Sequence, residues 1–444
     1  LRKHRATFLV MTLQSPPPPF PAFTRAFAFI GLTSFGGPAG QIALMHKEIV
    51  EDRGWMAEDD YLHALNFCHL LPGPEAQQLA TYIGWKLHGI KGGLTAGMLF
   101  VIPGAIVMFA LSILYAYAAD LRWFAALFLG IKAAVLAIVV QALIRIAGRA
   151  LGTRFKQGLA LAAFVALFLL GLPFPVIIVG AGLLGAVVAH FRPDWLGLKV
   201  ANAHPPNHIP VPLSQTVRTV AIWLSIWAAP MLLILATLGP DHILWKIGLF
   251  FSQLAVVTFG GAYAVLAYMA QAAVQGFGWL QPSEMADGLG LAETTPGPLI
   301  MVTQFVGFLA AFRAPAPFSP LMAGFLGAAL TTWVTFAPCF LWILTFAPWI
   351  DRLQHSTRLK GGLAAIAAAV VGVIANLALW FSLHVLFRSI RDVPGHIPQV
   401  DVASLDWRAA ILTALCAVLL FKVRWNVMKV LAVSALSGLM LGLG

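Results

Sequence analysis

The sequence predicts an all-α, polytopic membrane protein with two inverted-topology six-span repeats joined by one extra span, about 13 transmembrane helices in all. Three observations predict this fold class: the composition, a series of long apolar stretches, and an internal repeat. Of the 444 residues, 60% are hydrophobic and 10% are charged, whereas soluble domains are about 45–50% apolar and about 25% charged. So little charge cannot cover a water-facing surface, and the 31 phenylalanines would collapse a disordered chain in water. Soluble enzymes and disordered proteins are therefore excluded.

Thirteen apolar stretches are candidates for crossing a bilayer, which takes about 20 residues each. They lie at 22–45, 61–86, 92–118, 121–147, 157–172, 174–191, 217–239, 246–274, 283–312, 318–349, 360–387, 408–424 and 425–443. A polar, proline-rich segment at 193–216 separates the sixth stretch from the seventh. We therefore expect four parts, which are an N-terminal tail at 1–21, a first repeat at 22–192, a linker with the unpaired span at 193–245, and a second, inverted repeat at 246–444.

The internal repeat rests on three motifs that recur in one register. Phe-Gly-Gly at 35–37, Gly-Trp at 54–55 and Pro-Gly-Pro at 72–74 each return 224 positions later. Further along, Pro103 and Pro338 are 235 positions apart, and the same shift aligns Ala-Ala-Val at 133–135 with 368–370. An insertion of 11 residues explains the change of register, and the segment 313–320 with its three prolines is the expected place.

One unpaired span between two six-span halves gives the second half the opposite orientation in the membrane. The charges of the loops test this arrangement. With the N-terminus in the cytoplasm, the first half and linker place thirteen Lys and Arg residues inside and three outside. The second half places six inside and five outside, so it only leans toward inversion. The net charge of +11 is then explained by topology and anionic headgroups, and no nucleic-acid partner is expected.

The paired Pro-Gly-Pro motifs lie inside apolar spans, where proline must break a helix. A half-helix that starts just after each break presents free N–H groups and a positive dipole end near the membrane midplane, which favours an anion. The motifs are therefore candidate substrate-binding positions, together with the glycines of the two Phe-Gly-Gly motifs: Gly36, Gly37, Pro72, Gly73, Pro74, Gly260, Gly261, Pro296, Gly297 and Pro298. The alternative is that these motifs only kink helices for packing.

Polar residues beside the breaks are further candidates, because ionisable groups inside a membrane are costly and tend to be functional. They are Glu75, Gln77, Glu293, Thr294 and Thr295. A carboxylate would repel an anion unless protonated, which indicates a gating or proton-linked role, or else each one caps a half-helix. Lys132 is the one basic residue placed deep in a span, and its repeat partner is Ala367. It is a candidate anion ligand, unless it extends to the interface.

Nothing in the sequence predicts a metal site, a cofactor or catalysis. The three cysteines lie far apart without a Cys-x-x-Cys motif, and no Gly-Lys pair exists to form a phosphate-binding loop for ATP. An intramembrane enzyme acting on lipid would require a Ser/His/Asp or carboxylate–metal set at one membrane depth, and none is evident. We therefore expect a transporter rather than an enzyme.

The motifs resemble those of the chromate ion transporter family, in its long form with two fused homologous halves. The resemblance rests on Ser-Phe-Gly-Gly-Pro at 34–38, Leu-Pro-Gly-Pro at 71–74, Glu-Thr-Thr-Pro-Gly-Pro at 293–298, and the segments 256–263 and 371–377. It implies a multi-pass protein of a bacterial-type inner membrane that exports chromate, with a link to sulfate handling, and confers chromate resistance. The expected partners are a small oxyanion and the lipid bilayer, and a homodimer stays open.

Two alternatives to a potential-driven chromate exporter remain at this point. One is a proton-coupled transporter of another anion such as sulfate. The other is a cation exporter that uses Glu75 and Glu293 as ligands, whose transport would depend on these carboxylates rather than on Lys132.

Overall fold

The computed structural model describes residues 16–119, 121–198, 212–259, 262–350, 353, 356–391 and 399–443. These residues contain sixteen α-helices and a single two-residue antiparallel ladder, β1 (Ile390–Arg391) with β2 (Gln399–Val400). The predicted all-α class is confirmed. Six helices are long and apolar enough to cross a membrane: α5 (Glu75–Ala118), α6 (Arg122–Ala150), α8 (Phe174–Phe191), α9 (Leu213–Leu238), α14 (Pro320–Phe346) and α16 (Thr357–Leu386).

Four of the predicted spans are interrupted, two of them at the Pro-Gly-Pro motifs where the sequence predicts broken helices. The span 22–45 divides into α2 (Phe20–Thr33) and α3 (Gly37–His46), and 246–274 divides into α10 (Ile243–Val257) and α11 (Ala262–Gln271). The span 61–86 divides into α4 (Glu58–Cys68) and the start of α5. The span 283–312 divides into α12 (Pro282–Thr294), then η4 (Leu299–Met301) with α13 (Val302–Arg313). Each Pro-Gly-Pro motif lies between two helices, because its prolines cannot continue one.

Helix α5 is a tight hairpin and not one straight rod. His88 and Gly89 leave helical geometry, and Gly89 has a φ of 63°. The helical segments on either side pack together so closely that a Cβ on Gly84 would lie 2.4 Å from the carbonyl oxygen of Gly92. The predicted spans 61–86 and 92–118 are thus separate segments. In the second half, the equivalent turn between α13 and α14 is the longer connection 314–319, within the segment where the 11-residue insertion was predicted.

Each span with a Pro-Gly-Pro motif folds back at the motif and forms a helical hairpin, α4 with the first segment of α5, and α12 with α13. An ion pair joins the two ends of each hairpin. In the first half, the Lys86 ammonium is 3.0 Å from the Asp60 carboxylate. In the second half, the Arg313 guanidinium pairs with Glu284, which is 224 positions after Asp60. The two ends of each broken span are thereby held together at its open end.

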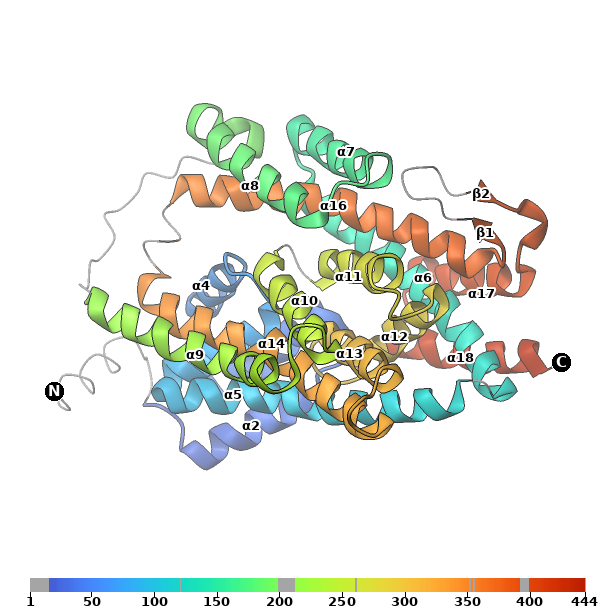
Figure 1. Ribbon diagram of the computed structural model, residues 1–444. Coiled ribbons are helices and arrows are strands. Elements are labelled where there is room, and N and C mark those ends of the chain that lie inside the picture. Colours follow the sequence, from blue (N-terminus) through green and yellow to red (C-terminus); the bar gives the residue numbers. More distant parts are fainter. Residues whose placement is uncertain are drawn as a thin grey trace.

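The two halves pack crosswise at their outer helices. Helix α6 packs against α17 (Trp407–Ala417) and α18 (Val427–Leu443), whereas α16 packs against α7 (Arg154–Phe168) and α8 (Figure 1). Helices α17 and α18 begin 253 positions after α7 and α8, so a second insertion of 18 residues separates them from the 235 register. This insertion coincides with the segment that carries β1 and β2, and the sequence motifs did not reveal it.

Small residues allow these crosswise contacts. A Cβ on Gly130 of α6 would lie 1.8 Å from the Ser434 carbonyl oxygen, and one on Gly438 would lie 2.4 Å from the Gly130 nitrogen. In the other pair, a Cβ on Gly185 of α8 would lie 2.4 Å from the Gly361 carbonyl oxygen. The backbones touch, as expected where small residues drive helix association in membranes.

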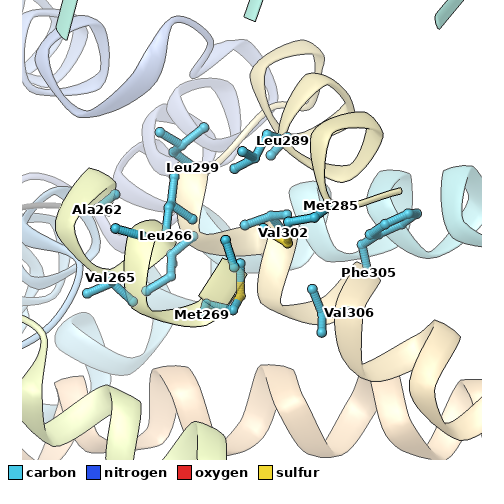
Figure 2. Packing of buried hydrophobic residues seen from close by; sticks show 14 of the residues in the cluster. Ala262, Val265, Leu266, Met269, Met285, Leu289, Leu299, Val302, Phe305 and Val306 are labelled. Carbon is cyan, nitrogen blue, oxygen red and sulfur yellow. The ribbon is translucent and has the colours of Figure 1, made fainter. Parts of the chain in front are cut away.

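The short helices α4, α10, α11, α12 and α13 occupy the middle of the molecule, between α16 and α5 (Figure 1). Figure 2 shows how three short helices of the second half pack together. Met269 of α11 lies beside Met285 of α12 and Val302 of α13, with Phe305 next to them. This buried apolar cluster fixes the start of α11 relative to η4 and α13, which is where the candidate site lies.

Candidate anion site at the four chain breaks

The four points at which a helix is interrupted, after α2, α4, α10 and α12, lie close together. Backbone hydrogen bonds connect each Pro-Gly-Pro motif to the other half of the chain. The Gly73 amide donates to the carbonyl oxygen of Thr258 at 2.8 Å, and the Gly297 amide donates to that of Ser34 at 2.9 Å. Ser34 ends α2 and Thr258 ends α10, and they are themselves 224 positions apart. Each bond is therefore the repeat equivalent of the other. Together they satisfy backbone groups that a broken helix would leave unpaired within a membrane.

Both central glycines are required by backbone conformation and by close contact. Gly73 has a φ of 123° and Gly297 a φ of 89°, a region that side chains with a Cβ rarely adopt. A Cβ on Gly73 would lie 3.0 Å from the Cys339 sulfur of α14. In the second half, a Cβ on Gly104 of α5 would lie 2.3 Å from the Pro296 carbonyl oxygen. Each motif is thus pressed against the long helix of the opposite half.

A small pocket of about 20 Å³ opens where the half-helices begin, which is about the room that one water molecule takes. Its lining residues come from the first turns of four helical segments, which are α3, α5, α11 and η4 with α13. They are Pro38, Gln41, Pro74, Glu75, Ala76, Ala262, Pro298, Leu299 and Ile300. Helix N-termini carry unpaired N–H groups and a positive partial charge. Four of them meet at this pocket, an arrangement that favours an anion, while most of the exposed lining is apolar.

Three of the predicted site residues line the pocket, and several others are their neighbours along the chain. Pro74, Glu75 and Pro298 are lining residues. Gly36 is the N-cap of α3 with a φ of 86°, and Gly37 is the first residue of that helix. The remaining motif residues are Pro72, Gly73, Pro296 and Gly297. The amides of Gly73 and Gly297 donate the hydrogen bonds that connect the two halves. Gly260 and Gly261 lie outside the described residues.

The other predicted polar residues are near the breaks but are not lining residues. The Gln77 amide donates to the Thr81 hydroxyl at 3.1 Å, and its buried Oε1 has no partner among the described residues. The hydroxyls of Thr294 and Thr295 both donate to the Leu291 carbonyl oxygen within α12. Buried Glu293 accepts a 2.9 Å hydrogen bond from the Tyr263 hydroxyl of α11.

Lys132 does not line the pocket either, because its ammonium is 3.2 Å from the Asp287 carboxylate of α12. The other oxygen of Asp287 accepts a 2.7 Å hydrogen bond from the Tyr115 hydroxyl of α5. The Asp287 side chain is 7% exposed and that of Lys132 is 23% exposed. This ion pair joins helices from the two halves of the chain.

Sequence reasoning missed Gln41 and Asp287. Gln41 is 1% exposed, lines the pocket and donates from Nε2 to the Gly297 carbonyl oxygen at 2.5 Å. A signal existed, because Gln41 is an amide one turn after Phe-Gly-Gly in an apolar stretch. Asp287 is a carboxylate within the predicted span 283–312, and the cost of a buried charge could have singled it out.

Comparisons with known proteins agree with the motifs. The sequence model of the chromate transporter family matches residues 22–186 and 245–439, one match in each half. A chromate transport protein of Pseudomonas aeruginosa is 30% identical over 379 residues, which are 84% of this chain and 83% of that protein. A probable chromate transport protein of Synechococcus elongatus is 28% identical over 387 residues, 87% of this chain and 89% of that protein.

A chromate transport protein of Cupriavidus metallidurans is 26% identical over 373 residues, which are 83% of each chain. No solved structure matches the chain. The similarity runs through both halves and includes both Pro-Gly-Pro motifs. A multi-pass transporter is therefore indicated, and not an enzyme. The chain belongs to the chromate transporter family, in its long form with two homologous halves.

Proposed function

We propose that this protein exports chromate, or a related tetrahedral oxyanion, across the inner membrane, and that the membrane potential drives the export. The observation that carries the proposal is the convergence of four half-helix N-termini on one pocket. Each N-terminus is equivalent to about half a positive charge, so four supply about two. This matches the charge of chromate or sulfate. In the cell, such export would confer resistance to chromate.

The lining disfavours a cation as the substrate. A cation exporter would bring several carboxylates or carbonyl oxygens to the pocket, whereas the described lining residues include one carboxylate, Glu75. Glu293, the second carboxylate that the sequence offered, is bonded to Tyr263 and is not a lining residue. The helix N-termini contribute donors, which suit an oxyanion.

We also propose that the two halves are inverted in the membrane, within a thirteen-span topology. The exchanged bonds from Gly73 to Thr258 and from Gly297 to Ser34 are the pattern that a two-fold relation produces. In Figure 1, α16 runs from left to right, and its repeat equivalent α6 runs from lower right to upper left. Opposite directions of equivalent helices support inversion, and substrate sites of inverted repeats lie where broken helices of both halves meet.

The membrane potential suffices as the energy source. An inside-negative potential contributes about 2.3 kcal/mol per elementary charge per 100 mV. Moving a dianion outward is therefore favoured by about 4.6 kcal/mol per 100 mV, which corresponds to a concentration ratio of about 2,000-fold. ATP hydrolysis is not required for such a gradient.

The test is chromate uptake into inside-out membrane vesicles with a potassium gradient and valinomycin. A lumen-positive potential should drive uptake, equal potassium on both sides should abolish it, and excess sulfate should compete if the pocket recognises tetrahedral dianions generally. Vesicles without the protein provide the control. Uptake that persists after the potential collapses and follows added ATP would contradict the proposed energy source, and potential-driven uptake of sulfate but not chromate would reassign the substrate.

A further inference from the structure

One of the four half-helix N-termini at the pocket already faces a negative charge of the protein itself. Glu75 is the first residue of α5, directly after the N-cap Pro74, and it lines the pocket with a side chain that is 17% exposed. A carboxylate at the first turn of a helix is stabilised by the same N–H groups and dipole that would bind a ligand anion. The equivalent position in the second half is Leu299. The pocket is therefore asymmetric, with one built-in anion.

The carboxylate has a proton-bearing neighbour that reaches water. Nδ1 of His69, at the end of α4, is 3.2 Å from Glu75 Oε2, and the His69 side chain is 45% exposed. The other titratable groups near this pair are the Cys68 thiol of α4 and Arg149 of α6. Among the described lining residues, α3, α11 and the start of η4 present no other titratable group to the pocket.

The second lining polar group, Gln41, has an unpaired acceptor. Gln41 Nε2 donates to the Gly297 carbonyl oxygen, which fixes the orientation of the amide because a carbonyl oxygen can only accept. Gln41 Oε1 then points elsewhere, and it is buried without a partner among the described residues. An unpaired buried acceptor is costly. A bare dianion has no hydrogen to donate to such an acceptor, whereas a protonated carboxyl group has one.

We propose that Glu75 is a tethered competitor for the anion pocket and takes up one proton each time an oxyanion binds. This inference rests on the proposed function and specifies how the site is regulated. Two adjacent anions in a site of low dielectric repel strongly, and a neutral Glu75 removes that repulsion. His69 gives its proton to Glu75 and regains one from water, so the overall change is one proton bound with one dianion. If the proton leaves together with the dianion, one net negative charge crosses the membrane per cycle, which is half the charge that a bare dianion would move.

The experiment uses the purified full-length protein in detergent, with chromate at pH 8 and sulfate as probes. Calorimetric titrations in buffers of different ionisation enthalpy count the protons taken up per anion bound. We expect about one proton for the wild type and none for Glu75→Gln. Sulfate stays a dianion across the neutral range, so uptake of one proton per anion means that its affinity for the wild type should rise by up to about tenfold per pH unit as the pH falls. In Glu75→Gln it should stay flat.

Glu58→Gln is the matched control. Glu58 is also the first residue of a helix, α4, and its carboxylate pairs with a histidine, His46, at 2.5 Å, but it is not a lining residue of the pocket. This variant should take up the same proton as the wild type. Glu75→Leu is a second variant in case Glu75→Gln does not fold, because leucine occupies the equivalent position in the other half. It should bind anions without proton uptake.

The outcomes separate this inference from the proposed function. Anion binding by the wild type without proton uptake, or with the same uptake in Glu75→Gln and Glu75→Leu, would overturn the role of Glu75 and leave the anion site standing. A pH-independent sulfate affinity of the wild type would do the same. Failure of the wild type to bind either chromate or sulfate would overturn both proposals.

Discussion

Lys132 and Asp287 are the clearest difference between the two halves at the level of single residues. Their equivalents are Ala367 and His63, so this ion pair does not recur at the symmetric position. In the present arrangement it connects α6 of one half to α12 of the other, with Tyr115 of α5 as a third member. Its geometry favours a role in holding the halves together, although the sequence predicted Lys132 as an anion ligand.

A double-mutant test separates these two roles of Lys132. Lys132→Ala leaves the Asp287 charge buried without a counter-ion, which for buried pairs costs about 3–5 kcal/mol. We expect lower thermal stability in detergent and loss of chromate transport. Adding Asp287→Asn should restore both, because it removes the uncompensated charge. Restored stability without restored transport would instead assign Lys132 to substrate binding.

The central glycines of the Pro-Gly-Pro motifs should be sensitive even to one added methyl group. At Gly73 and Gly297 the φ angle is positive, and at Gly73 the new Cβ would also press on Gln78 and Cys339. We expect Gly73→Ala and Gly297→Ala to reduce chromate export while the protein still inserts, with Gly73→Ala more severe. Gly158→Ala is the control, since Gly158 lies in α7 with open space around it. Wild-type chromate resistance of both motif variants would reduce the motifs to packing kinks.

Part of the site could be predicted from residues alone. Glu75 and the two Pro-Gly-Pro motifs were identified because proline interrupts an apolar span wherever it occurs in this pattern, and because the 224 register repeats it. Gln41 and Asp287 could have been noticed as polar residues in apolar stretches, but their roles could not be assigned, because they depend on partners 256 and 172 positions away, Gly297 and Tyr115. Such contacts arise only from how the halves cross.

At the level of helices, hydropathy located the apolar segments but not their interruptions. By hydropathy alone the stretch 22–45 reads as one span, because Phe35 and Pro38 around the break are apolar, and only the Phe-Gly-Gly motif marks the interruption. The structure ends α2 at Thr33 and starts α3 at Gly37. The shift to a 253 register was missed because the segment with β1 and β2 carries no repeated motif. The helix boundaries could therefore be predicted where a repeated motif marks them, and the prediction was wrong where no such motif is present.

The crosswise contact of α8 with α16 offers a test at the element level. Gly185 faces the Gly361 carbonyl oxygen, whereas Gly180, on the same helix, has nothing within 4 Å of its added Cβ. Gly185→Ala should force the helices apart at a cost of about 1–3 kcal/mol, typical of overpacking. Gly180→Ala should be neutral or slightly stabilising. Thermal unfolding in detergent measures both, and equal melting temperatures would show that the two helices do not touch as described.

At the level of the whole molecule, the reciprocal bonds between the breaks couple the two halves. The Gly73–Thr258 and Gly297–Ser34 bonds place both Pro-Gly-Pro motifs at one level, and the ion pairs Asp60–Lys86 and Glu284–Arg313 close the hairpins at their far ends. If the halves are inverted, these two ion pairs lie on opposite faces of the membrane. Alternating access would then open one hairpin while the other stays closed.

Single introduced cysteines test this inversion directly. The three native cysteines are free and buried, so a membrane-impermeant maleimide should give a low background. Lys91 follows the turn at the start of the second segment of α5, and Ala314 lies in the connection before α14, the equivalent place in the other half. Ala314→Cys should react in intact cells, and Lys91→Cys only after the membrane is opened. Labelling of both from one side would rule out inverted halves, and the opposite pair of results would keep the inversion but reverse the predicted cytoplasmic position of the N-terminus.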